Sequence, residues 1–418
     1  MKRLLILTII TVMFSYISTA QEITTLDSLV TEALENNPEI KASIARWEAS
    51  TMRPSQQGSL PNPIIGGKIK NVSFSEFTLG DDPRSDIQAF VVQEFPFPGK
   101  LSLKEQVALE HSEAQRWDSE AVSRNVIADL KTAYYEWFLA NKAIDITNRN
   151  KELLTKFVEI AEVKYKVGKG IQQDVIKAQV EISSFIERLV LLKQKKEIYE
   201  ARINSILNYP PGTDLGKPEE VTKAELKINL EKLTEIMQER APLLNSKSEM
   251  IEKSEKNYEL AKKQYYPDLI LQGTYFNRSG GDADLDDIWE VGLGLRVPLY
   301  YWRKEKPGVQ EKSYELREAK EIYDTTKNDI LFTLNDNFIT AKSAEKLIEL
   351  YATGIIPQSK LSLESAISGY QVGDIDFLTL LDNLVTLFNF EIEYYKQLTE
   401  YQQSIARIEE ITGLDLIM

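Results

Sequence analysis

The chain has 418 residues and no cysteine, and its 50 Lys and Arg residues face 64 Asp and Glu residues, a formal net charge of −14 at pH 7. Such acidity argues against nucleic acid as a partner, because a phosphate backbone attracts basic surfaces. The lack of cysteine excludes disulfides, thiolate metal sites and a lipidated cysteine. The length is compatible with two or three compact domains or with one elongated repeat protein.

The first twenty residues have the organisation of a secretory signal peptide. Lys2 and Arg3 precede an apolar run, and the small residues Ser18 and Ala20 stand where signal peptidase recognises its substrate. We therefore expect residues 1–20 to be a signal peptide that is removed on export. The alternative is an uncleaved membrane anchor, for which the apolar run is short of the roughly 20 residues that span a bilayer.

The rest of the chain reads as two tandem copies of one unit. Pro38 and Pro63 align with Pro242 and Pro267 at the same offset of 204 residues. The motif YKVGKG, which begins at Tyr165, recurs as YQVGD at an offset of 205 residues. Turn and helix-break residues that recur at one spacing indicate an internal duplication. We predict a first structural repeat at 21–208, an inter-repeat linker at 209–224 and a second repeat at 225–418.

Each repeat contains two long stretches in which apolar residues recur at steps of three and four. These stretches are residues 126–165 and 175–206 in the first repeat, and 330–351 and 378–395 in the second. This spacing is the seam of a coiled coil. Glycines lie between the two stretches of each repeat and supply the backbone freedom that a reversal requires. We therefore predict antiparallel helical hairpins with tips at 167–170 and 372–374.

Two stretches before each hairpin alternate with a period of two. The predicted strands are about 63–75 and 86–96 in the first repeat, and about 267–278 and 288–299 in the second. In the clearest of them the apolar residues Trp289, Val291, Leu293 and Leu295 alternate with charged residues and glycine.

One apolar and one polar face is typical of a membrane strand with lipid outside and water inside. Because four strands are too few to close a barrel, the chain must oligomerise or stay out of the membrane. The alternative is a soluble sandwich or a hairpin packed on helices.

Residues for catalysis or for cofactor and metal binding are lacking in the sequence. The single histidine, His111, lies among Glu110, Ser112 and Glu113, where we expect an exposed helix turn, and one imidazole cannot hold zinc alone. The sequence has no phosphate-binding loop, nucleophile elbow or His-containing triad. We therefore expect no enzyme, no cofactor and no bound metal.

Two units, each with a helix, a strand pair and a long hairpin, resemble the outer membrane efflux protein family typified by TolC. The resemblance covers residues 25–414, and QEFPFPGK at 93–100 is similar to the strand-to-helix crossing of the heavy-metal, CzcC-type branch. It implies a mainly α fold with a transmembrane β part. Three chains would each lend four strands to a twelve-stranded β-barrel, and their coiled-coil hairpins would form a periplasmic α-barrel.

The resemblance implies a passive exit duct in the bacterial outer membrane, with most of the chain in the periplasm. The cargo of this branch is metal cations. The implied partners are two further copies of the chain, a periplasmic adaptor, an inner-membrane pump of the RND type and outer membrane lipid.

Site residues follow from the same resemblance. Val167, Gly168, Val372 and Gly373 would dock the adaptor, and Asp382 would contribute to a carboxylate ring at the tunnel mouth that favours cations. Asp174 and Tyr370 match positions that latch neighbouring hairpins. The cation expected two residues after the second tip glycine is replaced by Ile375, so the gating bonds are expected to differ. The alternatives are a plain turn for the tips and a solvated helix face for Asp174 and Asp382.

Three other functions stay open at this level. A periplasmic adaptor also carries a helical hairpin, but adaptors usually carry one hairpin, whereas this chain has two in tandem. A coiled-coil scaffold without a pore fits the hairpins but leaves the alternation at 288–299 unexplained. A duct for drugs or secreted protein would need the same architecture as a duct for metals.

Overall fold

The computed structural model describes residues 23–72, 84–278 and 286–416. The expected signal peptide, residues 1–20, lies outside the described residues, as do parts of the two loops that connect the strands. The chain divides into two compact units, each made of segments that are distant in sequence. The first comprises Met1–Glu35, Leu130–Lys223 and Glu345–Thr399, and the second comprises Asn36–Asp129, Ala224–Ala344 and Glu400–Met418. Each unit therefore contains segments of both sequence repeats.

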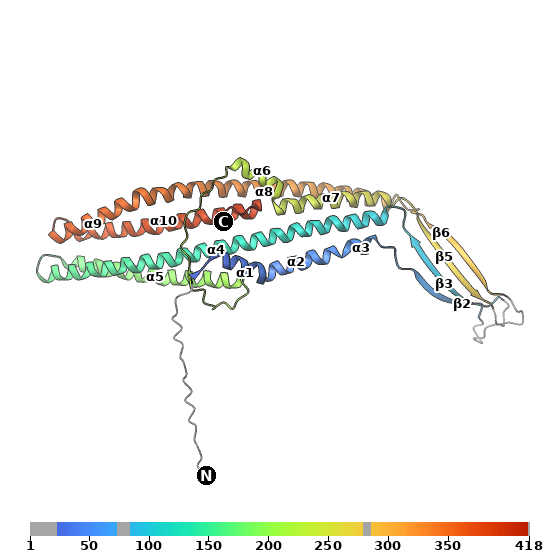
Figure 1. Ribbon diagram of the computed structural model, residues 1–418, viewed down its shortest axis with the longest axis horizontal. Helices are drawn as coiled ribbons and strands as arrows, with labels where there is room; N and C mark the ends of the chain where they lie inside the picture. Colours follow the sequence, from blue (N-terminus) through green and yellow to red (C-terminus); the bar gives the residue numbers. More distant parts are fainter. Residues whose placement is uncertain (1–22, 73–83, 279–285, 417–418) are drawn as a thin grey trace, which may run out of the picture. The chain divides into compact units, whose positions relative to one another are not determined.

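Two helical hairpins form the core of the first unit (Figure 1). The C-terminal part of α4 (Lys100–Lys166) returns as α5 (Gln172–Ile206), and α9 (Ile356–Val372) returns as α10 (Phe377–Thr412). Both seams contribute to one cluster of buried residues, in which the rings of Phe185 and Phe388 lie 5.0 Å apart at 76°. The predicted antiparallel hairpins are confirmed, and the apolar spacing places each seam in this core.

A π-helical turn, η1 (Tyr351–Ile355), separates α8 (Glu305–Leu350) from α9. Pro357 has no N–H to donate to the carbonyl four residues before it, so the regular ladder is interrupted there. The N–H of Ile356 instead donates to the carbonyl of Tyr351, five residues back. The outgoing helix of the second repeat thus continues past a proline by widening one turn.

A small parallel sheet anchors the start of the described chain in the first unit. β1 (Ile23–Thr24), which precedes α1 (Leu26–Asn36), pairs with β4 (Lys217–Pro218) inside the expected linker. The buried hydroxyl of Tyr134 donates to the Thr24 carbonyl at 3.1 Å and accepts from the Glu219 N–H at 3.0 Å. Burial raises the pKa of Tyr134 to about 12, so the phenol stays protonated at neutral pH.

Shorter helices belong to the second unit. They are α2 (Pro38–Thr51), α3 (Arg53–Gly58), α6 (Leu230–Arg240) and α7 (Pro242–Lys263). Asn37 caps α2 by accepting the N–H groups of Glu39 and Ile40 at 2.8 and 3.1 Å. Small buried hydroxyls permit close approach to α4, as between the Oγ atoms of Ser43 and Ser119 at 2.9 Å.

The second unit also contains a four-stranded antiparallel sheet of order β2-β3-β5-β6. The strands are β2 (Ile64–Lys70), β3 (Asp86–Phe95), β5 (Asp268–Asn277) and β6 (Ile288–Arg296). The central β3–β5 pair joins the two repeats, and β2 and β6 are the edges. A mainly helical fold with a four-stranded sheet confirms the predicted fold class. Within the described ranges, no helix has a stretch apolar and long enough to traverse a bilayer.

Two strands are shorter than the alternation predicts. β6 ends at Arg296 rather than near Leu299, because Pro298 cannot donate to a neighbouring strand. β2 ends at Lys70, and the next residue, Asn71, has a left-handed φ of 54°. The last residues of the predicted range 63–75 lie outside the described chain.

Candidate functional site: an open apolar sheet and paired hairpin tips

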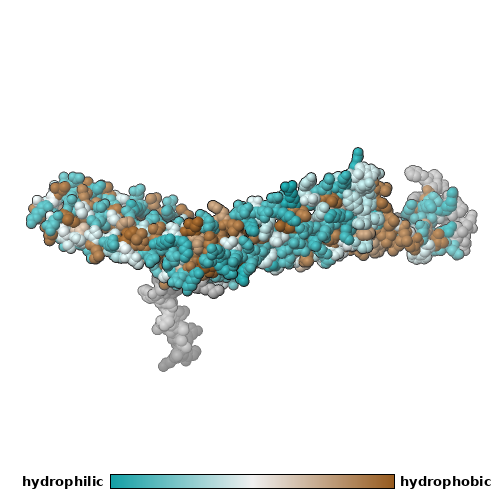
Figure 2. All heavy atoms as spheres, turned by 90° about the horizontal axis from the view of Figure 1, so that it is seen from above, coloured by the Kyte–Doolittle hydropathy of each residue, from teal (hydrophilic) through white to brown (hydrophobic). Residues whose placement is uncertain are grey.

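One face of the sheet is apolar across its width. Residues that pair directly across an antiparallel sheet point to the same face, and Trp289 pairs with Tyr275, which pairs with Ala89. Leu293 and Leu295 pair in the same way with Leu271 and Leu269. Figure 2 shows hydrophobic residues gathered over the strands near their junction with the helices.

This apolar face is uncovered in the single chain. The exposed fractions of Trp289, Val291, Leu293 and Leu295 are 77, 76, 75 and 64%. Within the described ranges no helix shields them, so the structure does not contain the soluble sandwich that was the alternative. β3 and β5 have 10 residues each, the length of roughly 9 to 11 residues that a tilted transmembrane strand requires.

The opposite face of the sheet is more polar. Gln272 pairs with Gly292 and Thr274 pairs with Glu290 across β5 and β6. Glu94 and Arg296 form an ion pair on the same face. Both edge strands end the sheet without a partner strand in the described chain, which is the arrangement that invites pairing with another copy.

A buried ion pair holds the strand-to-helix crossing of the first repeat. The Lys100 ammonium, almost fully buried, lies 2.7 Å from Oδ1 of Asp268 and donates to the Tyr266 carbonyl at 2.9 Å. The same carboxylate accepts the N–H of Phe97 at 2.8 Å. The end of QEFPFPGK is thus fixed to the start of β5. Its partner lies 168 positions away, so no local pattern in the sequence could reveal the pair.

The hairpin tips present exposed valines beside left-handed glycines. Val167 and Val372 are 62 and 74% exposed. Gly168 has a φ of 74° and Gly373 a φ of 93°, a conformation that strongly favours glycine at a helix end. The N–H groups of Gly373 and Asp374 both donate to the Gly369 carbonyl, at 3.0 and 2.9 Å, and close the end of α9.

Tyr370 joins the two hairpins of the first unit near their tips. Its ring is buried and lies edge-on to Phe377 at 5.6 Å. The Lys164 ammonium lies 4.0 Å from the ring centroid and donates to the Tyr370 carbonyl. Position 375 holds isoleucine, and the cation that reaches Tyr370 comes from α4 of the same chain. Sequence reasoning missed this contact because the two residues are 206 positions apart.

Acidic side chains surround the same tips. Burial and the nearby Asp376 carboxylate raise the pKa of Asp174. The N–H of Thr379 donates to Asp376 at 2.7 Å, and this bond lowers the pKa of Asp376. Asp382 lies exposed on α10 with no hydrogen bond or ion pair to any described residue. The structure therefore brings Asp174, Tyr370 and Asp376 together and leaves Asp382 free in the single chain.

The expectation for His111 is wrong in one respect. The side chain is partly buried in the second unit rather than exposed, and its Nδ1 has no hydrogen-bond partner within the described chain. Burial, then the nearby Lys253, lowers its pKa, so the ring is neutral at pH 7. No group of three histidine or acidic side chains in the described ranges is arranged to hold a metal ion.

A protein family and several known proteins match both the sequence and the architecture of this chain. The family model described as "Outer membrane efflux protein" matches residues 29–209 and 233–414, one match for each repeat. The cobalt-zinc-cadmium resistance protein CzcC of Cupriavidus metallidurans is 21% identical over 407 residues, covering 93% of this chain and 90% of that protein.

Solved outer membrane proteins share the fold at low sequence identity. The outer-membrane channel OprN is 18% identical with a TM-score of 0.81, and the match covers 94% of this chain and 90% of OprN. VceC of Vibrio cholerae is 16% identical with a TM-score of 0.79, covering 93% of this chain and 96% of VceC. CusC, which forms a transmembrane channel, is 13% identical with a TM-score of 0.79, and the match covers 93% of this chain and 91% of CusC.

A match over most of both repeats decides the family, whose members are transport proteins rather than enzymes. The chain belongs to the outer membrane efflux protein family and is an efflux channel component of the outer membrane.

Proposed function

We propose that three copies of the chain assemble into a passive exit duct through the outer membrane. The observation that carries this proposal is the four-stranded sheet, which has an uncovered apolar face and two free edges. Four strands cannot satisfy their edge groups in lipid, whereas three copies supply twelve strands and close the wall. The apolar face with Trp289, Val291, Leu293 and Leu295 then contacts lipid, and the polar face lines the pore.

The proposed cargo is divalent metal cations. The support is the similarity to CzcC, whose name states resistance to cobalt, zinc and cadmium, and the free carboxylate of Asp382 near the tips. A ring of three such carboxylates favours cations electrostatically without binding them tightly. The duct needs no metal site of its own for this role, because a wide polar passage is sufficient.

The proposed partners are a periplasmic adaptor and an inner-membrane pump of the RND type that supplies the energy. Val167 and Val372, each beside a glycine, form small apolar projections with accessible backbone, which suits docking of the adaptor's own hairpin. Tyr370, Lys164 and Asp174 lie just behind these projections, where a change in docking could alter how the two hairpins pack.

Assembly and conductance are tested on the purified full chain in detergent and in planar bilayers. We expect a heat-resistant trimer and discrete conductance steps, at least after opening changes such as Lys164→Met. A stable monomer, or trimers without conductance in either form, would reject the duct in favour of a scaffold.

Cargo is tested in the source bacterium by deleting the gene and restoring it on a plasmid. We expect the deletion to lower tolerance to cobalt, zinc or cadmium and the plasmid to restore it. Lowered tolerance to drugs alone would replace the metal cargo with a drug cargo and leave the duct intact.

A further inference from the structure

An exposed aromatic cluster follows the apolar strand β6. We call residues 299–306, LYYWRKEK, the junction segment, because they connect β6 to α8. Tyr300, Tyr301 and Trp302 are all exposed, and the Trp302 ring lies 6.1 Å from that of Tyr300 and 5.4 Å from that of Tyr301. Tyr265, two residues after the end of α7, adds a fourth exposed ring, 6.2 Å from Tyr301. This cluster continues the uncovered apolar face of the sheet directly.

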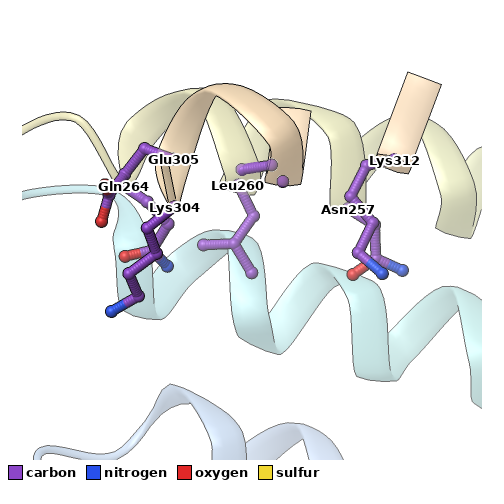
Figure 3. Close-up of a pocket in the computed structure, with 8 residues that line it drawn as sticks. Asn257, Leu260, Gln264, Lys304, Glu305 and Lys312 are labelled. Atoms are coloured by element: carbon purple, nitrogen blue, oxygen red, sulfur yellow. The ribbon is translucent and has the colours of Figure 1, made fainter. Parts of the chain in front are cut away.

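The same segment carries unpaired positive charge. Arg303, Lys304 and Lys306 are exposed, and none forms an ion pair with a residue that the structure describes. The one acid of the segment, Glu305, is buried at 9% exposure. Figure 3 shows Glu305, Gln264 and Lys304 together at one end of a cleft of about 500 Å³ that is lined by residues of α7, of α8 and of the positions next to these two helices. The outward charge of the segment is therefore positive in a chain whose net charge is −14.

The position of these cations is unfavourable for the helix itself. α8 begins at Glu305, so two cations precede its first turn and one lies within it. A helix N-terminus carries a partial positive charge and favours acids. The cations are therefore not explained by helix stability, whereas an external anion would interact favourably with both the cations and the helix end.

The first repeat shows that a strand-to-helix crossing does not need this arrangement. At the equivalent place, Lys100 is buried and paired with Asp268, and the Phe97 ring stacks on Tyr266 at 4.5 Å and 14°. The cation and the aromatic ring of the first repeat therefore both have partners within the protein. In the second repeat the corresponding groups face outward, which indicates a partner outside the chain.

We propose that the junction segment binds the phosphate headgroups of an anionic bilayer surface. The inference rests on the proposed placement of the sheet in the membrane. Aromatic rings with a polar edge favour the headgroup level of a membrane, and cations just beyond it attract anionic lipid. Tyr300, Tyr301 and Trp302 lie at this level, and Arg303, Lys304 and Lys306 contact the phosphates.

Lipid selectivity measures this directly. The full chain is reconstituted in phosphatidylcholine vesicles that contain traces of spin-labelled phosphatidylglycerol or phosphatidylcholine, and the immobilised fraction of each label is compared. We expect the wild-type chain to prefer phosphatidylglycerol. In the triple variant Arg303→Gln/Lys304→Gln/Lys306→Gln this preference should fall by a factor of roughly five or more, since one surface cation alone contributes about that factor. The matched control removes three exposed cations of α5, as Lys177→Gln, Lys193→Gln and Lys195→Gln.

Any of three outcomes overturns the proposal. The wild-type chain shows no preference for phosphatidylglycerol, the junction variant keeps that preference, or the α5 control loses as much of it as the junction variant does. If the junction variant does not fold, 0.5 M NaCl applied to the wild-type chain serves instead, because screening should abolish a headgroup attraction. Conductance of the same preparations tests the duct separately. A variant that conducts normally but has lost its lipid preference supports both proposals, whereas a chain that conducts neither as wild type nor with Lys164→Met contradicts the duct.

Discussion

At the scale of single residues, one lysine connects the two hairpins near their tips. Lys164 contacts both the ring and the carbonyl of Tyr370. Together a partly buried charged hydrogen bond and a cation–π contact contribute about 1 to 2 kcal/mol. We expect Lys164→Met to accelerate amide exchange at the end of α9 by roughly ten-fold, as measured by hydrogen–deuterium exchange and mass spectrometry.

Two residues further along α4, Lys166 provides the control. Its ammonium lies 3.7 Å from Glu162 in an exposed pair, an interaction that contributes little. Lys166→Met should leave exchange at α9 unchanged. Equal acceleration by both variants would show that general charge removal, rather than the contact with Tyr370, loosens the tips.

Asp382 is the residue that decides ion preference in the proposed mouth. Its exposed carboxylate would face the same residue of two other copies, and the three charges would raise the local cation concentration. Asp382→Asn should lower the cation-to-anion permeability ratio by on the order of two-fold, measured from reversal potentials under a salt gradient. Glu152→Gln removes an exposed carboxylate from α4 and should leave the ratio intact. An unchanged permeability ratio in Asp382→Asn would show that Asp382 does not line the tunnel mouth.

At the scale of elements, the glycine at the end of α9 is required by backbone conformation alone. Nothing lies within 4 Å of a Cβ placed at Gly373, yet its φ is 93°. Gly373→Ala should therefore destabilise the last turn of α9 by about 1 kcal/mol and speed amide hydrogen exchange there. Gly308 in α8 has equally open space and no left-handed φ, so Gly308→Ala should slow exchange there. Acceleration at both sites would contradict a conformational cause at Gly373.

Elements set by local patterns could be predicted from the sequence, whereas those set by distant contacts could not. Two patterns are local in the sequence. The period-two alternation around Val291 predicted the strands, and the glycines between the paired helical stretches predicted the hairpins. The pairing of β1 with β4 and the Lys100–Asp268 pair join segments 194 and 168 positions apart, and neither has a local signature. The π-helical turn before Pro357 had a visible cause, but the sequence does not say whether a proline kinks, ends or widens a helix.

At the scale of the whole molecule, the duct depends on which side of the sheet contacts lipid. Leu293 lies near the middle of β6 on the open apolar face, and Gln272 lies on the neighbouring strand with its side chain on the opposite face. A lysine facing the middle of a bilayer costs about 2 to 4 kcal/mol, whereas a lysine facing water in the pore costs little. We therefore expect Leu293→Lys to reduce the yield of heat-resistant trimer in outer membrane fractions sharply, as seen on unheated gels.

Gln272→Lys should assemble almost normally, because it adds the same charge within the same part of the sheet. Its effect should appear instead in the conductance, as weaker passage of cations through a pore with three additional positive charges. If Gln272→Lys abolished assembly while Leu293→Lys was tolerated, the two faces would have to exchange roles, and the open apolar face would line an interior. Equal tolerance of both changes would mean that neither face contacts lipid, since only a bilayer distinguishes the two positions so strongly.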